Sequence, residues 1–366
     1  MTDTPTLYWE NATAYDLFIS LHVLHNPDKF GLRGSWAAGV RSRLPQSERK
    51  TLEQADLLFW IPLPWIHELP EPRDGQTALE ALAAIPPADR LPELALRPAT
   101  PDEQAELLLE VRSRGSWTPA DKEVLKAAWK QRGYQARQPA LESVLDGWAQ
   151  AQAVGEAYLE ALQVYYEVFF AEEERRIFPA LERSLQEARR LGGKLALEPL
   201  IEELSQGVRF EPPLIDDRGD LVLVPSFWTT PLVIYERLAP DRYIFVFGGR
   251  PIDASLVPGD MVPDAMLHAL KALADPTRLR ILRYLIDRPL TPSQLARRLR
   301  LRAPTVVHHL SELRLAGLVQ LTVDTPGKKG DRRYAARSEA IPRVFDALQA
   351  FLVQEDYEKT EELLKT

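Results

Sequence analysis

Two histidines near the start of the chain have the spacing of metal ligands. His22 and His25 are three residues apart in an apolar pattern that repeats every three to four residues, and Asp28 follows them. If this stretch is a helix, both imidazoles can face one ion. The alternative is that the two histidines end an amphipathic helix, where the helix dipole favours them. We favour this alternative and expect no metal site.

Carboxylates and nucleophiles make no stronger case for catalysis. Glu172, Glu173 and Glu174 could act as acids or bases, but a charge run is typical of a solvated surface. The chain has no cysteine, which excludes thiolate nucleophiles, zinc fingers and disulfides. The motifs G-x-S-x-G, H-E-x-x-H, G-x-x-x-x-G-K-[ST] and G-x-G-x-x-G are missing as well. We therefore expect no catalytic residue, no cofactor and no enzymatic activity.

The positive charge of the chain is concentrated in one segment. Residues 261–345 contain 16 lysines and arginines against 7 aspartates and glutamates, a net charge of +9. Because the whole chain carries −8, the remaining residues carry −17. Such a division indicates a domain that faces nucleic acid, attached to a region that does not contact phosphates.

The basic segment has the start and stop signals of consecutive helices. An apolar-rich helix over 266–274 ends at Asp275 and Pro276, which can cap and open a second helix. The predicted inner face of that helix consists of Leu279, Leu282, Leu285 and Ile286. A capping box over 291–294 then opens a short helix.

A third helix from Pro304 ends at Gly317, and its predicted inner face consists of Val307, Leu310 and Leu313. The β-rich strings LVQLTV and RRYAA then bracket a turn, DTPGKKGD, and predict a basic hairpin. The order of these elements is that of a helix-turn-helix followed by a wing.

The strings LKALADPTRLRILRYL, LTPSQLARRL and APTVVHHLSELRLAGLV, followed by the basic hairpin, resemble the ArsR family of winged-helix transcriptional regulators. The resemblance covers about 100 of the 366 residues. It implies a homodimer that binds an inverted repeat in double-stranded DNA. It also implies that the third helix enters the major groove and that the wing lies on the backbone or in the minor groove.

The resemblance assigns DNA contacts to two places. On the third helix, Thr305, His308 and His309 are expected to reach base edges or phosphates. Nearby cations are expected mainly to neutralise phosphates, which gives affinity rather than sequence choice. These cations are Arg302, Lys328, Lys329, Arg332 and Arg333. Val307 stands where family members commonly have serine, so we expect one polar contact to be missing or replaced.

The resemblance also bears on sensing and assembly. Metal sensors of the family use cysteine in the helix before the recognition helix, or a His/Asp set in the last helix. In this chain the helix before the recognition helix reads SQLARRL and has no cysteine, and the last helix, 345–364, has no histidine. We expect no metal sensing by either route. The last helix and residues 266–273 are expected to form the dimer interface, with the apolar side chains of Phe345, Leu348, Phe351, Leu352 and Tyr357.

The rest of the chain divides into a helical and a β-rich part. Residues 1 to about 205 have mostly helical periodicity, and short runs over 207–250 predict a small antiparallel sheet. The strings ATAYDLFISLHVLHNPDKFGLRGSW and GDLVLVPSFWTTPLVIYERLAPDRYIFVFGGRP look like the poorly characterised N-terminal region of some larger ArsR-type regulators.

The predicted fold class is therefore mainly α with a small antiparallel β-sheet (α+β), an N-terminal helical domain followed by a winged helix-turn-helix. The predicted domains are 1–206, helical; 207–258, a β-rich subdomain packed on it; 259–345, the winged helix-turn-helix; and 346–366, the dimerisation helix.

No stretch approaches the roughly 18 apolar residues of a membrane span, and the first residues lack the pattern of a secretory signal. We expect a cytoplasmic protein. Aromatic residues of the helical part could line a pocket for a small-molecule effector, or form core, as such residues more often do; they include Trp36, Trp60, Trp65, Trp148, Trp228, Tyr165 and Tyr166.

We expect a sequence-specific transcriptional regulator, a repressor, whose N-terminal domain senses an effector or binds a partner. The alternative is an N-terminal enzyme or ligand-binding domain whose winged helix binds another protein.

Overall fold

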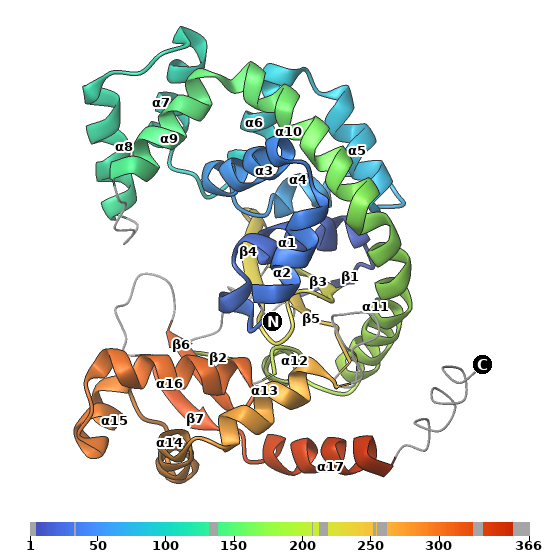
Figure 1. The fold of residues 1–366 in the computed structure, drawn as a ribbon, viewed down its shortest axis with the longest axis vertical. Coiled ribbons are helices and arrows are strands. Elements are labelled where there is room, and N and C mark those ends of the chain that lie inside the picture. Colours follow the sequence, from blue (N-terminus) through green and yellow to red (C-terminus); the bar gives the residue numbers. More distant parts are fainter. Residues whose placement is uncertain are drawn as a thin grey trace. The chain divides into compact units, whose positions relative to one another are not determined.

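The computed structural model describes residues 5–32, 34–131, 138–206, 208–211, 219–251, 254, 262–324 and 332–353. The chain divides into two units (Figure 1). The first comprises residues 1–187 and 217–249, and the second comprises residues 188–216 and 250–366. The chain therefore passes from the first unit into the second at residue 188 and returns to the first unit at residue 217.

Helices make up most of the first unit. They are α1 (Thr13–His25), η1 (Pro27–Phe30), α2 (Gly34–Arg43), α3 (Gln46–Leu58), α4 (Leu63–His67), α5 (Gly75–Ala84), α6 (Pro87–Ala95), α7 (Asp102–Arg114), α8 (Pro119–Gln131), α9 (Gln138–Ala149), α10 (Ala151–Tyr165), η2 (Tyr166–Phe170) and most of α11 (Ala171–Gly192). The α1 helix is buried on nearly all sides, as a helix without a polar face must be. Its one carboxylate within that buried stretch, Asp16, is 0% exposed.

The sheet of the first unit has four strands in the order β1-β3-β5-β4: β1 (Leu7–Trp9), β3 (Asp220–Ser226), β4 (Ile234–Ala239) and β5 (Arg242–Gly248). The β1 and β5 strands both pair with β3 in parallel, and only β4 with β5 is antiparallel. The sheet is therefore mixed, and the expectation of an antiparallel sheet is right for the β4–β5 pair and wrong for the other two pairs. A tight turn joins β4 to β5, whereas β3 lies on the other side of β5 and runs in the same direction.

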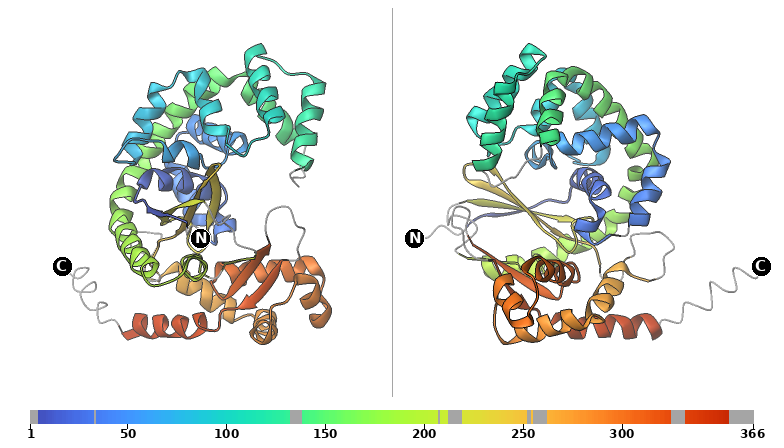
Figure 2. Two further views of the ribbon diagram at one scale, coloured as in Figure 1. Left: turned by 180° about the vertical axis from the view of Figure 1, so that it is seen from behind. Right: turned by 60° about the vertical axis from the view of Figure 1, so that its left-hand side comes forward.

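The second unit contains the predicted winged helix. Its elements are α12 (Leu197–Leu204), β2 (Val208–Glu211), α13 (Asp264–Leu273), α14 (Pro276–Asp287), α15 (Pro292–Leu299), α16 (Ala303–Leu315), β6 (Val319–Asp324), β7 (Arg333–Ala336) and α17 (Ala340–Val353). Its sheet has the order β2-β6-β7, and the orange β6 and β7 strands are drawn from two further sides in Figure 2. The β6 and β7 strands pair antiparallel, which confirms the hairpin expected at the wing.

The third strand of this sheet comes from elsewhere in the chain. The β2 strand, which the sequence analysis placed in the 207–258 subdomain, pairs in parallel with β6, with Val208 opposite Leu321. The α12 helix packs on β2. The edge of the wing sheet is thus covered by a segment that comes before β3 in the sequence, which local patterns do not reveal.

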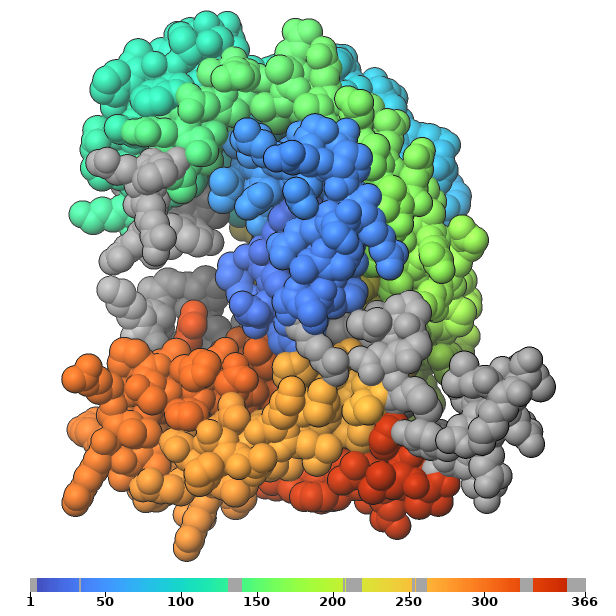
Figure 3. Space-filling model, viewed as in Figure 1, coloured from blue at the N-terminus to red at the C-terminus, as the bar shows by residue number. Residues whose placement is uncertain are grey.

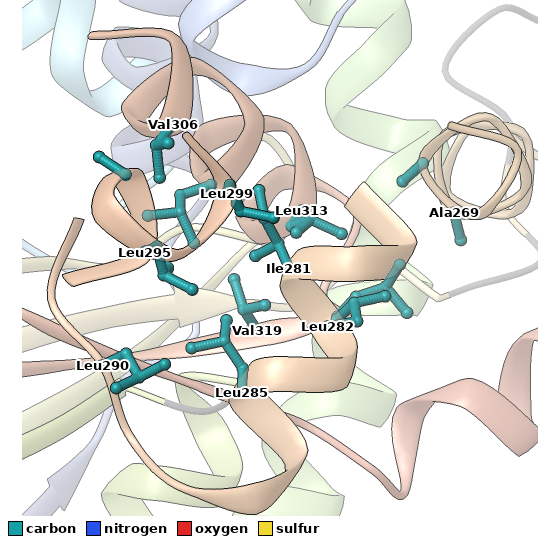
Figure 4. Close-up of a cluster of buried hydrophobic side chains, with 14 of the residues drawn as sticks. Ala269, Ile281, Leu282, Leu285, Leu290, Leu295, Leu299, Val306, Leu313 and Val319 are labelled. Atoms are coloured by element: carbon teal, nitrogen blue, oxygen red, sulfur yellow. The ribbon is translucent and has the colours of Figure 1, made fainter. Parts of the chain in front are cut away.

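The core of the second unit is built from one face each of α14, α15 and α16, together with buried residues of α13, β6 and α17 (Figure 4). On α14, Ile281, Leu282 and Leu285 are buried, whereas Leu279 is 47% exposed and Ile286 is 56% exposed. The predicted inner face of this helix was therefore right for Leu282 and Leu285 and wrong for Leu279 and Ile286. At about 100° per residue, the buried face is centred near Leu285, between Ile281 and Leu282, and the two exposed residues lie to one side of it.

Among the described residues, no helix is both long and apolar enough to cross a membrane.

Candidate nucleic-acid interface

Local capping interactions fix the helix-turn-helix. The Asp275 side chain accepts a hydrogen bond from the Arg278 backbone N–H (2.8 Å) and caps α14. At the start of α15, the Gln294 N–H donates to Thr291 Oγ1 (3.2 Å), and the Thr291 N–H donates to Gln294 Oε1 (2.9 Å). This is the predicted capping box.

The turn between α15 and α16 depends on a left-handed residue. Arg300 has φ +58°, and its N–H bonds back to the Ala296 carbonyl of α15. A non-glycine residue in this region is uncommon and is held by its surroundings. The turn brings the chain to Arg302, the N-cap of α16. It thereby sets the angle at which α16 leaves the rest of the unit.

The buried face of α16 differs from the predicted one by one residue. Val306, Leu310 and Leu313 are each 0% exposed, whereas Val307 is 49% exposed. Residues 306, 310 and 313 are four and three apart and share one helical face, and residue 307 is turned about 100° away from 306. The prediction that Val307 faces the core was wrong, and the outer face of α16 carries an apolar side chain.

The predicted contact residues of α16 fall into two groups. Arg302, Thr305 and His308 are exposed, in the place that a groove-reading helix requires. His309 is only half-buried, and its Nδ1 atom is buried without a hydrogen-bond partner. The pKa of Asp275 lies below its ordinary value, chiefly through the Arg278 N–H, with attraction from Arg278 and His309. His309 is therefore turned toward the start of α14.

The predicted wing residues are described only in part. Arg332 and Arg333 are exposed at the start of β7, whereas Lys328 and Lys329 lie outside the described residues. Burial lowers the pKa of the Arg314 guanidinium, and the charge of Arg332 lowers it further. A cation of α16 and a cation of the wing are therefore close together, and their shared positive potential favours an anion such as a phosphate.

Three further cations were not among the predicted contacts. Arg297 and Arg298 are exposed at the end of α15, and Arg300 is exposed in the turn that follows. Arg298 lies over the Tyr284 ring, 5.6 Å from its centroid. The signal that could have found them is the run of arginines directly before the recognition helix. In the space-filling view, the orange segment that contains α15 and α16 lies at the surface of the second unit (Figure 3).

The histidines of the first unit have separate partners. His22 Nδ1 is 2.6 Å from Asp56 Oδ1, and Trp60 Nε1 donates to His22 Nε2 (3.2 Å). His25 Nδ1 is 2.9 Å from the Leu21 carbonyl. Within the described residues, no three His, Cys, Asp or Glu side chains are grouped as metal ligands.

The glutamate run is less solvated than predicted. Glu172 is exposed, but Glu173 is 5% exposed and forms an ion pair with Arg176. Glu174 Oε1 accepts a hydrogen bond from the Gly75 N–H (2.8 Å) at the start of α5. The interpretation of the run as a solvated surface was therefore wrong for two of its three members. Glu174 thereby joins α11 to α5, whereas Glu173 pairs within α11.

Several aromatic side chains of the first unit belong to its core. Trp148, Trp228 and Tyr165 are nearly fully buried, and Trp36 stacks on Trp228 with centroids 5.0 Å apart. The cavity lined by Phe59, Trp60 and Tyr158 has a volume of about 20 Å³, enough for about one water molecule. A wider groove of about 750 Å³ is lined mainly by small and polar residues, including Arg112, Gln150, Gln152 and Glu156.

Comparison with known proteins agrees with this geometry. A helix-turn-helix domain family matches residues 273–322. The chain is similar to the HTH-type transcriptional regulator CmtR of Mycobacterium bovis (strain ATCC BAA-935 / AF2122/97) and of Mycobacterium tuberculosis (strains CDC 1551 / Oshkosh and ATCC 25618 / H37Rv). Each is 40% identical over 89 residues, which are 24% of this chain and 72% of the relative. The second unit thus contains a DNA-binding domain of transcriptional-regulator type, and the family match leaves the first unit unassigned.

Proposed function

Through its C-terminal domain the chain belongs to the ArsR family of winged-helix transcriptional regulators, and from this we propose that it represses transcription by binding an inverted-repeat operator as a homodimer. The observation that carries the proposal is the outer face of α16. Its inner face is anchored by three fully buried residues, so Thr305 and His308 are held outward. Arg302 at the helix start and Arg332 and Arg333 at the wing are exposed as well. Polar groups for base edges and cations for phosphates are the two components of specific DNA binding.

The homodimer is supported by apolar residues of α17. Phe345 is 53% exposed, Leu352 is 71% exposed and Val353 is 70% exposed. Residues 345 and 352 lie seven apart and share one face of the helix. The α17 helix packs on α13 within the unit, so the two helices together offer a surface to a second copy. A twofold dimer would place the two recognition helices about 34 Å apart, one turn of B-DNA.

The first unit is the proposed sensing module, and we propose no enzymatic role for it. The groove along α7 and the start of α10 has a volume of about 750 Å³, which is within the range of small-molecule sites. Arg112, Gln150 and Glu156 supply polar groups along it. A small polar effector bound there would alter operator occupancy, and the whole protein would act in the cytoplasm, where the chromosome is.

Titration against DNA tests this function directly. The full-length protein is titrated against the DNA upstream of its own gene and against scrambled DNA of equal length, at several salt concentrations. We expect a preference of roughly 10³ or more and an affinity that falls steeply with salt. Equal and weak binding to both duplexes at every salt concentration would contradict the proposal, and would favour a protein partner for the winged helix.

A further inference from the structure

We infer that Val307 reads a thymine in each half of the operator by packing against the thymine 5-methyl group in the major groove. This inference rests on the proposed function, because it requires that α16 enters the groove. The other residues of this face supply hydrogen bonds and charge. The inference adds Val307 to them as a residue that selects a base.

The exposure of Val307 is unusual for its helix. The other branched apolar residues of its first turns and middle, Val306, Leu310 and Leu313, are each 0% exposed, whereas Val307 is 49% exposed. A single exposed apolar side chain on a protein surface needs no explanation by itself. The position of Val307 does need an explanation, because Val307 lies within the surface that faces DNA in the proposed function.

Val307 shares its face with the polar residues of the helix. Pro304, Val307, His308 and Ser311 are all exposed, and they are three or four residues apart, so they form one contiguous patch on α16. A groove that receives His308 therefore receives Val307 with it. A valine in a helix has one strongly preferred rotamer, so its two methyl groups are held in place before DNA binds.

The side of α16 that carries Val307 is the side with the wing. Arg314 lies seven residues further along and therefore on the same side of the helix. The charge of Arg332, at the wing, acts on Arg314. Val307 thus lies on the side of α16 where the wing adds positive charge, and positive charge attracts the DNA backbone.

The chemistry of the major groove favours one base as the partner. All four bases present hydrogen-bond donors or acceptors there, and only thymine adds a methyl group. Valine makes no hydrogen bond, so it would leave a guanine or adenine acceptor dehydrated and unpaired, at a cost. Against thymine, valine buries a methyl group that is otherwise in water. Burial of one methyl group corresponds to about a fourfold gain in affinity.

The test removes that methyl group from the DNA and the valine from the protein. The preferred duplex of the full-length protein is first selected from random sequence. Each thymine is then replaced by deoxyuridine, which keeps base pairing and loses only the 5-methyl group. We expect one symmetric pair of positions at which the replacement weakens binding about fourfold per half-site. In Val307→Ser the same replacement is expected to change affinity by less than twofold.

The matched control is Val168→Ala, which shortens an exposed valine (36%) of the first unit. Val307→Ala and Val168→Ala remove the same atoms, and only Val307→Ala is expected to lose the sensitivity to deoxyuridine. A preferred duplex that tolerates deoxyuridine at every thymine would overturn the inference and leave the proposed function standing. Persistent sensitivity in Val307→Ser would overturn it as well. A selection that yields no preferred duplex would overturn the proposed function, and this inference with it.

Discussion

Asp16 is a carboxylate with no exposure to water, in the middle of α1. It accepts hydrogen bonds from Ser226 Oγ (2.7 Å) and the Trp228 N–H (3.3 Å) at the end of β3. Burial raises the pKa of Asp16 to about 7, and the hydrogen bonds only partly oppose that rise. In the unfolded chain an aspartate has a pKa of about 3.9. Between these two pKa values the folded state holds a proton that the unfolded state has lost.

The free energy of unfolding is therefore expected to fall as the pH rises through this window, by about 3 kcal/mol between pH 5 and pH 8 from Asp16 alone. Asp16→Asn is neutral at every pH and is expected to lack this part of the pH dependence. Urea unfolding of both proteins at pH 5 and pH 8 measures it. Asp28→Asn, at an exposed position, is the control. A difference between wild type and Asp16→Asn that is the same at both pH values would contradict the assignment.

The cations and the polar residues of the interface are expected to respond differently to mutation. Arg333→Ala should weaken binding to all duplexes about equally and reduce the salt slope by about 1, because the guanidinium neutralises a phosphate. His308→Ala should instead relax sequence preference at one position, at a cost of about 1–3 kcal/mol on the preferred base. Binding isotherms on preferred and scrambled duplexes at several salt concentrations separate the two. If Arg333→Ala altered preference alone, the division of roles would be wrong.

At the scale of elements, the sequence predicts best what neighbouring residues determine. The capping box at Thr291, the cap at Asp275 and the hairpin at the wing follow from residues within a few positions, and the structure contains them. The inner face of α16 was misjudged by one residue because Val306 and Val307 are chemically the same, and only packing distinguishes them.

Pairing between distant segments was not predictable in this way. A β-rich run does not specify its neighbour, so the parallel pairs of β3 with β5 and of β2 with β6 could not be read from the sequence. At the site, the exposure of Arg302, Thr305 and His308 could be predicted from the motif, whereas the inward turn of His309 depends on its electrostatic interaction with Asp275 at the start of α14.

The β2 strand joins the wing sheet to a distant part of the sequence, because α12 precedes it and β3 follows it in the chain. It lies at the edge of the sheet, and in a parallel pair successive residues direct their backbone groups to opposite sides. Of Arg209→Pro and Phe210→Pro, one should therefore remove a hydrogen bond to β6, and the other should affect only the free edge. We expect faster hydrogen exchange across residues 319–324 and weaker DNA binding in one variant only. Equal behaviour of the two would contradict the pairing.

At the scale of the whole molecule, the winged-helix segment and the rest of the chain carry charges of opposite sign. Residues 261–345 carry +9 and the remainder carries −17, so the acidic part repels phosphates and leaves the winged helix as the surface that DNA can approach. A single winged helix contacts one half-site. The affinity for an operator therefore depends on joining two copies, because the second half-site is then bound at a high effective concentration.

This dependence makes the α17 surface the place where assembly and DNA binding can be tested together. Leu352→Glu puts a charge on a side chain that is 71% exposed, so the fold of the unit should survive while a dimer interface would have to bury the carboxylate. We expect sedimentation to shift toward monomer and operator affinity to fall by about 10² or more, with thermal unfolding changed little. Leu57→Glu, at an exposed leucine (54%) of the first unit, is the control. A dimer that persists in Leu352→Glu would place the interface elsewhere.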